Sequence, residues 1–136
     1  TSPNNTANTF TTANLTTTTP FKVSIVNIVT NCESNRVDIQ AIINPLPTAP
    51  TASDEGRCGT GTVTLTANGA VAGQIYRWYD SANTLVKTST SHTDNTFTTG
   101  SLTANTTFSV SIVDANTCES GRTTVNVSIV NPPSTV

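Results

Sequence analysis

The amino-acid sequence predicts an all-β fold, specifically an antiparallel β-sandwich built from tandem repeats. Short segments alternate apolar and polar residues with a period of two, and Gly, Pro and Asn turn signals separate these segments by roughly 8 to 12 residues. Threonine, which favours strands, contributes 30 of the 136 residues. Together these features favour two packed sheets whose outer faces are rich in hydroxyl groups.

Two stretches of the chain are versions of one another. Residues 9–36 read TFTTANLTTTTPFKVSIVNIVTNCESNR, and residues 96–122 read TFTTGSLTANTTFSVSIVDANTCESGR. The positions correspond at an offset of 87 as far as Ile25 and Ile112, and at an offset of 86 from Cys32 and Cys118 onward. One loop residue therefore differs between the copies, and the pattern is that of a tandem repeat.

The repeat divides the chain into a partial and a complete module. Residues 1–44 correspond to the C-terminal half of a preceding repeat, in which residues 21–25 and 37–41 predict a hairpin with an uncovered apolar face. Residues 45–133 form the complete repeat, and residues 134–136 begin the next linker. The proline-bearing stretches NPLPTAP and NPPSTV predict short extended linkers, so we expect the sequence to be part of a longer array.

The complete module contains seven candidate strands, at residues 48–53, 62–67, 74–79, 84–88, 96–99, 106–113 and 123–130. Trp78, the only tryptophan, lies on the third of them, where immunoglobulin-like domains bury theirs. The apolar residues that face one side of these strands predict the core: Val63, Leu65, Tyr76, Trp78, Leu85, Phe97, Leu102, Phe108, Val110, Ile112, Val125, Val127 and Ile129.

Four motifs carry a family resemblance: CGTGTVTLTA (58–67), YRWYD (76–80), FTTGSLTANTTFSVSI (97–112) and TCESGR (117–122). They resemble the immunoglobulin-like repeats of Bacteroidota cell-surface proteins, which accompany type IX secretion and gliding-motility adhesins. The resemblance implies an extracellular, multi-repeat, non-enzymatic role. It therefore predicts a structural stalk repeat of a large secreted filamentous adhesin that mediates surface attachment or gliding.

The three cysteines predict a disulfide framework, because neither CxxC pairs nor Cys/His spacing supports a zinc site. The family pattern suggests a bond between Cys58 and Cys118, with Cys32 bonded to an upstream cysteine outside this sequence. In simple immunoglobulin topology, however, the start of the second strand and the last turn lie at opposite ends of the sandwich. Either the Cys58 segment folds along the module, or Cys58 bonds the next repeat; reduced thiols are a further alternative.

Other side chains give weaker site signals. His92, the only histidine, lies in a polar run without a nucleophile motif and predicts a solvated loop residue. Ser81 lies in an Asp-Ser-Ala sequence that matches a Bacteroidota O-glycosylation pattern. The carboxylates near loops match no calcium-binding motif, so we expect no metal and no cofactor: Asp54, Glu55, Asp80, Asp94 and Asp114.

Composition and exposed aromatics define the expected partners. Tyr79 with Arg77 is a candidate contact for a surface polysaccharide, although cross-strand packing is the more conservative interpretation. Charged residues make up 10% of the chain and the net charge is −2, which leaves no basic patch for nucleic acid. No apolar run approaches the roughly 18 residues of a membrane span. We expect neighbouring repeats as partners and no enzymatic activity; the alternatives are a carbohydrate-binding module and an accessory domain of a secreted hydrolase.

Overall fold

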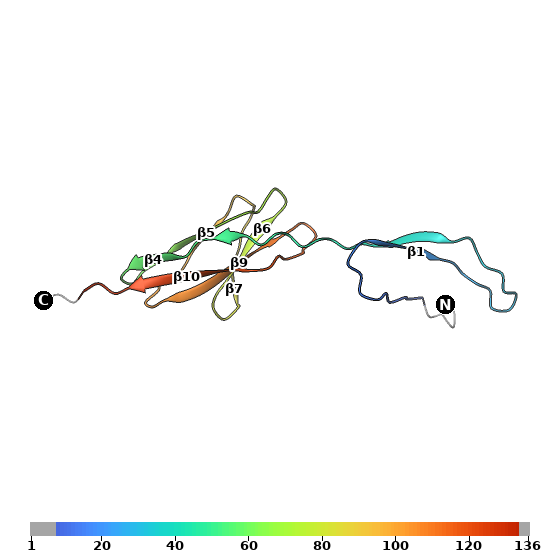
Figure 1. The fold of residues 1–136 in the computed structure, drawn as a ribbon, viewed down its shortest axis with the longest axis horizontal. Helices are drawn as coiled ribbons and strands as arrows, with labels where there is room; N and C mark the ends of the chain where they lie inside the picture. Colours follow the sequence, from blue (N-terminus) through green and yellow to red (C-terminus); the bar gives the residue numbers. More distant parts are fainter. Residues whose placement is uncertain (1–7, 134–136) are drawn as a thin grey trace. The chain divides into compact units, whose positions relative to one another are not determined.

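The computed structural model describes residues 8–133, which belong to two compact units, residues 1–44 and residues 45–136. All regular elements in the described residues are β-strands (Figure 1). The first unit, called the hairpin unit here, holds β1 (Thr19–Val23) and β2 (Val37–Ala41). The second, called the complete module, holds the other eight strands: β3 (Thr51–Ala52), β4 (Glu55–Cys58), β5 (Thr64–Asn68), β6 (Ile75–Tyr79), β7 (Leu85–Thr88), β8 (Thr96–Thr98), β9 (Thr106–Val113) and β10 (Thr123–Val130).

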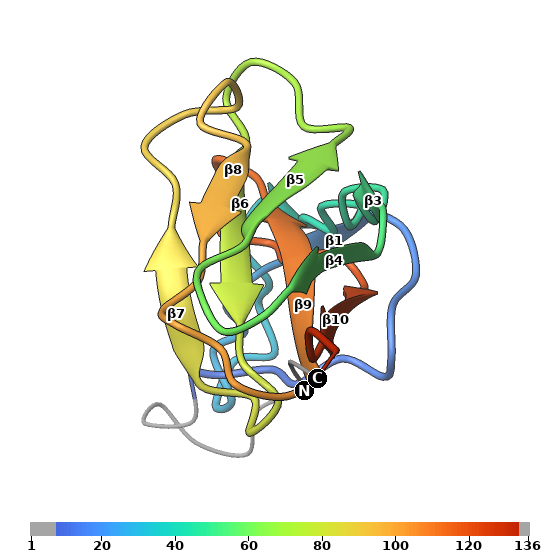
Figure 2. The same ribbon diagram turned by 90° about the vertical axis from the view of Figure 1, so that its left-hand side faces the viewer.

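The complete module is a sandwich of two sheets. The five-stranded sheet has the order β4-β10-β9-β6-β7, and the three-stranded sheet has the order β3-β5-β8. Figure 2 shows β5 and β8 in one layer in front of β6 and β9 in the other. Within the module the strand pairs are antiparallel, with the exception of β4 and β10, which are parallel. The predicted immunoglobulin-like sandwich is therefore confirmed.

The first predicted strand, at residues 48–53, differs in the structure. The chain makes only a two-residue strand, β3, beside β5, and then crosses to the other sheet, where β4 pairs with β10. Asp54 lies at this crossing, and its carboxylate accepts a hydrogen bond from the Asn126 backbone N–H at 2.7 Å. Strand β4 reads EGRC and is exposed throughout, so it has no apolar alternation that would reveal it in the sequence.

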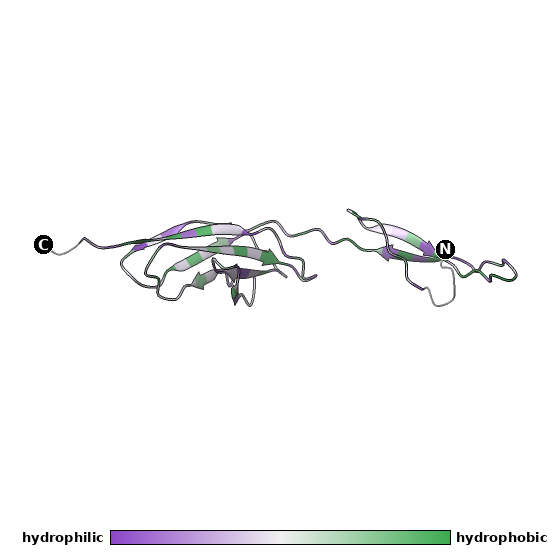
Figure 3. Cartoon of the chain, turned by 90° about the horizontal axis from the view of Figure 1, so that it is seen from below, coloured by the Kyte–Doolittle hydropathy of each residue, from purple (hydrophilic) through white to green (hydrophobic). Residues whose placement is uncertain are grey.

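The core lies between the two sheets. Ten of the thirteen predicted core residues are buried there together with Ala67, and Phe97 and Leu102 pack against them. Alternating apolar and polar bands along the strands in Figure 3 show the period-two pattern that produces this arrangement. Leu85 was expected in the core, but its exposed fraction is 47%. It lies on β7 at the edge of the five-stranded sheet, where a register shift sets it opposite Tyr79, whose side chain lies on the outer face rather than in the core.

Aromatic rings connect the two layers. The centroid of Phe97 on β8 lies 5.8 Å from that of Trp78 on β6 and 5.5 Å from that of Phe108 on β9. Trp78 is fully buried, and so is Tyr76, whose hydroxyl accepts a hydrogen bond from the Ala70 backbone N–H at 3.0 Å. Each ring of this size buries a large apolar area between the two sheets.

The hairpin unit repeats the pairing register of β9 and β10. Phe21 lies opposite Ile39 as Phe108 lies opposite Val125, which are the partners expected from the offsets of 87 and 86. Val23 and Ile39 are each 50% exposed, whereas Val110 and Val125, their counterparts in the complete module, are fully buried. The hairpin therefore has the strand pairing of a module's last two strands without the opposing sheet. That residues 1–44 are half of a repeat stays a prediction.

The central role of Trp78 is testable by truncation. We expect Trp78→Ala to lower the free energy of unfolding of the complete module by about 3 to 5 kcal/mol, because a fully buried ring leaves a large cavity. Leu85→Ala is the matched control and should cost about 0.5 kcal/mol or less, since this side chain is half exposed. Urea denaturation followed by circular dichroism measures both values, and equal losses would contradict the assigned core.

The two units should differ in autonomy. We expect residues 45–133 to fold alone, because they contain both sheets, and residues 1–44 to remain unfolded alone, because two strands bury too little apolar surface. Amide dispersion in NMR spectra of the two separate fragments measures this. A well-dispersed spectrum from residues 1–44 would show that the hairpin does not need an opposing sheet.

Candidate functional site

A polar cluster on the outer face of the five-stranded sheet is centred on Glu119, in the turn between β9 and β10. The Tyr79 hydroxyl and the Ser111 hydroxyl each donate a hydrogen bond to Glu119 Oε1 at 2.7 Å. Arg77 Nη1 donates to Oε2 at 3.3 Å. Arg122 completes the Glu119 cluster, with its Nε 3.6 Å from Oε1. Strands β6 and β9 thus supply the donors, and the turn supplies the acceptor.

Electrostatics keep this carboxylate ionised. Partial burial disfavours the charged form of Glu119, but the hydrogen bonds from Ser111 and Tyr79 and the charges of Arg122 and Arg77 outweigh that effect. The pKa of Glu119 is therefore held below its ordinary value. With two hydroxyl groups and two guanidinium groups around it, the carboxylate is fully engaged by its own module.

The same turn is built in the same way in the hairpin unit. Glu33 accepts a hydrogen bond from the Ser24 hydroxyl at 2.6 Å and from Arg36 Nε at 3.1 Å. Its neighbour Ser34 accepts from the Ile25 backbone N–H at 3.0 Å, as Ser120 accepts from the Ile112 N–H at 2.9 Å. The recurring Cys-Glu-Ser-x-Arg motif therefore encodes a turn, in which the Glu and Ser side chains bind the preceding segment and the Arg side chain pairs with the Glu.

Tyr79 is not the exposed aromatic that the sequence predicts. Only 6% of its surface is exposed, and the Arg122 guanidinium lies 3.4 Å from the centroid of its ring. Arg77, its proposed companion in ligand contact, is paired with Glu119. Sugar-binding platforms need an open aromatic face, and here a cation already covers it. Ligand contact by Arg77 and Tyr79 stays a prediction that this packing does not favour.

Ser81 is exposed in the turn between β6 and β7. The Asp80 carboxylate shapes this turn by accepting hydrogen bonds from the backbone N–H groups of Ala82 at 2.9 Å and Thr84 at 2.8 Å. The Ser81 hydroxyl is accessible to a modifying enzyme, and its O-glycosylation stays a prediction. None of the residues that line the shallow hollow beside Ser81 is aromatic. The lining consists of Asn105, Thr106, Thr107, Asn126, Val127 and Ser128.

The structure separates Cys58 from Cys118. Cys58 lies opposite Val130 at the end of β10, while Cys118 precedes Glu119, which pairs with Val113 beyond the start of that strand. About ten residue steps along β9 and β10, at about 3.3 Å each, place them roughly 30 Å apart. A disulfide requires Cα atoms within about 7 Å, so a bond inside the module is incompatible with this fold. Cys32, Cys58 and Cys118 have no disulfide partner within this structure.

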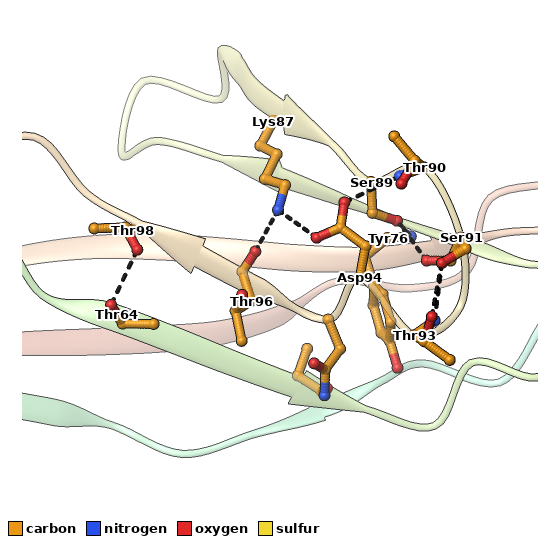
Figure 4. Close-up of polar contacts among 12 residues, drawn as sticks. Thr64, Tyr76, Lys87, Ser89, Thr90, Ser91, Thr93, Asp94, Thr96 and Thr98 are labelled. Carbon is orange, nitrogen blue, oxygen red and sulfur yellow. Dashed lines mark hydrogen bonds and ion pairs between the residues drawn. The ribbon is translucent and has the colours of Figure 1, made fainter.

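A second group of polar contacts fastens the crossover from β7 to β8 (Figure 4). Lys87 Nζ donates to Asp94 Oδ1 at 2.7 Å and to the Thr96 carbonyl at 2.6 Å, and the Thr90 N–H donates to Asp94 Oδ2 at 3.1 Å. Hydrogen bonds from Lys87 and Thr90 hold the pKa of Asp94 below its ordinary value. His92 lies in this loop and is partly exposed. The contacts shape the loop, and Asp94 is committed to them.

Within residues 8–133, no group of three or more His, Cys, Asp or Glu side chains is placed to hold a metal ion. Among the carboxylates singled out in the sequence, Asp54, Asp80 and Asp94 each accept hydrogen bonds from nearby backbone N–H groups. In the same described range, no helix is long and apolar enough to cross a membrane.

Comparison with known proteins agrees with this architecture. The family model described as "Ig-like domain CHU_C associated" matches residues 47–132. The chain belongs to this family. Proteins with immunoglobulin-like domains of this kind typically use them as structural or adhesive modules rather than as catalysts, and the Glu119 cluster fits that use. No curated protein matches the sequence.

Three solved structures are similar to this chain at low sequence identity. The fibronectin(III)-like modules of Clostridium thermocellum CbhA are 14% identical, with a TM-score of 0.54; the alignment covers 74% of this chain and 55% of that one. The Ig1 domain of mouse SynCAM 2 is 10% identical, with a TM-score of 0.45 and coverage of 62% and 97%. The chicken CNTN1 FN1–FN3 domains are 12% identical, with a TM-score of 0.44 and coverage of 85% and 45%.

The Glu119 cluster gives a pH-dependent prediction. Its lowered pKa means that the ionised carboxylate stabilises the fold at neutral pH, and that this stabilisation is lost as the pH falls through the folded-state pKa, below 4.5. We expect Glu119→Gln to lower the free energy of unfolding by about 1 kcal/mol at pH 7, with a smaller difference from wild type at pH 3.

Urea denaturation of both proteins from pH 3 to pH 7, followed by Trp78 fluorescence, measures this difference. Glu33→Gln is the matched control, because this equivalent residue makes its polar contacts within the hairpin unit and should leave the Trp78 transition unchanged. A Glu119→Gln difference that stays constant across the whole range would contradict the assigned role.

Proposed function

We propose that this chain is a structural stalk repeat of a large secreted, filamentous cell-surface adhesin, which holds a distal binding region away from the cell during attachment or gliding. Membership of the Ig-like domain family supports a structural or adhesive role. The observation that carries the proposal is the parallel pairing of β4 with β10, because it joins the two ends of the complete module in a load-bearing geometry.

The direction of pulling decides how these hydrogen bonds break. The chain enters the module through the two-residue strand β3, continues into β4 and leaves after β10, and β4 and β10 run the same way (Figure 1). Tension applied at the two ends therefore slides β4 and β10 in opposite directions along their length. The bonds between them lie across the force and must break together rather than one after another. This shear arrangement resists extension in the folded state.

Several contacts strengthen this pair. The Gly59 N–H donates to the Val130 carbonyl at 2.8 Å, which extends the pairing beyond the end of β4. Gly56 lies so close to Ser128 that an added Cβ would approach the Ser128 carbonyl oxygen to 3.3 Å. Asp54 also holds Asn126, through the backbone at 2.7 Å and the side-chain amide at 3.2 Å. The incoming segment is thus fastened along most of β10.

The two alternative functions have less support from the side chains. A carbohydrate-binding module needs an accessible aromatic ring, and the Tyr79 ring is covered by Arg122. An accessory domain of a secreted hydrolase would share this fold, and the fibronectin(III)-like modules of CbhA provide a structural likeness at 14% identity. That likeness concerns the fold alone. A stalk role uses the β4–β10 pair directly, whereas neither alternative requires it.

Single-molecule stretching tests the stalk proposal. The protein to be stretched is an engineered tandem of complete modules. In it Asn131 of each module is followed by Pro45 of the next, and serine replaces all cysteines. We expect evenly spaced unfolding peaks, each releasing about 87 residues, or roughly 300 Å of contour length. Extension without peaks would show that the module does not bear load and would reject the proposal.

Proline substitution tests the β4–β10 pair itself. One of two consecutive N–H groups in a strand faces the neighbouring strand, so Glu55→Pro with Gly56→Pro removes a hydrogen bond to β10. We expect a lower unfolding force. The control is Leu85→Pro with Val86→Pro in β7, which lies at the other edge of the same sheet, outside the direct path of load. If both pairs of substitutions lower the force equally, the load is not carried by β4 and β10.

A further inference from the structure

The cysteines of the complete module lie at its two opposite poles. The C-terminal pole contains Cys58, which lies opposite Val130 at the end of β10 and is exposed. The N-terminal pole contains Cys118, in the turn between β9 and β10. Their separation of roughly 30 Å excludes a bond within the module, as the strand registers show. A disulfide at either cysteine would therefore need a partner from outside the module.

Each pole is also a point where the chain passes out of the module. At the N-terminal pole, the β9–β10 turn lies beside the incoming segment, because Gly121 approaches Ala49 and the Thr123 hydroxyl donates to the Pro50 carbonyl. At the C-terminal pole, the chain continues from Val130, the residue whose carbonyl binds Gly59 N–H next to Cys58. Any module joined directly to this one would meet one of these cysteines at the junction.

We propose that Cys58 of one module forms a disulfide with Cys118 of the module that follows it in the chain. The proposal rests on the tandem arrangement in the proposed stalk. Short proline-bearing linkers bring the C-terminal pole of one module to the N-terminal pole of the next, where an exposed thiol and the Cys-Glu-Ser turn face the same junction. Cys32, in the equivalent turn of the hairpin unit, takes the Cys118 position one module earlier.

The oxidant is a small-molecule disulfide, such as glutathione disulfide. The Cys58 thiolate attacks one sulfur of this disulfide, which forms a mixed disulfide and releases the first small-molecule thiolate. The Cys118 thiolate of the next module then attacks the Cys58 sulfur, which forms the bond between modules and releases the second thiolate. The two cysteines lose two protons and two electrons, and the small-molecule disulfide is reduced to two thiols. An oxidising compartment sustains the reaction.

The bond would change the path of tension. In a chain linked at every junction, load enters a module at Cys118 and leaves it at Cys58, so the linkers and the residues outside these positions no longer extend. The part of each module that bears tension is then the 60 residue steps between Cys58 and Cys118, rather than all 87 residues of the repeat. Unfolding a linked module should release roughly 200 Å of contour length in place of roughly 300 Å.

The test uses a tandem protein of residues 1–131 followed by residues 45–136, which recreates the Asn44–Pro45 junction between two complete modules. Serine replaces all cysteines apart from Cys58 of the first module and Cys118 of the second. With glutathione disulfide at low protein concentration, we expect both thiols to disappear in a monomer lighter by two hydrogen atoms. Peptide mapping without reduction should recover the two cysteine peptides joined.

Two control tandems keep other pairs. One keeps Cys118 of the first module and Cys58 of the second, which lie at the outer poles; the other keeps both cysteines of the first module. We expect both controls to form an intramolecular bond at least about tenfold more slowly, because neither pair shares a junction. Circular dichroism of the reduced proteins checks that all three tandems are equally folded.

The outcomes distinguish this inference from the proposed function. Thiols that persist in the junction pair of a folded tandem would overturn the disulfide, and so would closure of the same-module pair at an equal rate. The stretching experiment on cysteine-free modules is independent of this result. Regular unfolding peaks without a junction disulfide would leave the stalk proposal intact and reject the disulfide alone.

Discussion

The exclusion of water from between two small sheets is the constraint on which this structure depends. Trp78, Phe97 and Phe108 span the gap, and the remaining core residues are mostly Val, Leu and Ile on alternate positions of β5, β9 and β10. The hairpin unit shows what the same strands look like without that cover. Val23 and Ile39 keep the register of Val110 and Val125, yet half of each side chain remains exposed.

The polar features of the chain serve this sandwich from outside. The Glu119 cluster ties the β9–β10 turn to β6 and β9, and Lys87 with Asp94 ties the crossover between the two sheets. These residue types also occur in active sites, but here each charged group is engaged by backbone or side-chain partners of its own module. Their arrangement explains why the Cys-Glu-Ser-x-Arg sequence appears in both copies: it specifies a turn.

Much of the fold could be predicted because the core strands alternate strictly. Strands β9 and β10 have the predicted bounds, and the paired burial of Tyr76 and Trp78 follows from their spacing. Strand β4 was missed because Glu-Gly-Arg-Cys forms an exposed edge held by backbone bonds and has no apolar signal. The environment of Tyr79 was missed because it depends on Glu119 and Arg122, which are about 40 residues away in sequence. The period-two alternation of apolar residues predicts which side chains are buried between the sheets. It does not predict which side chains contact one another on an outer face.

The outward-facing threonines affect how this surface responds to ionic strength. Thr64 and Thr98 share a 3.0 Å hydrogen bond across β5 and β8, and threonine hydroxyls rather than charged groups alternate with the core residues along these strands. Ionic strength weakens attractions and repulsions between exposed charges, but it has little effect on a neutral hydroxyl bound to water. The contribution of this face to solubility should therefore be insensitive to the screening of charges as the ionic strength rises from that of fresh water to that of sea water.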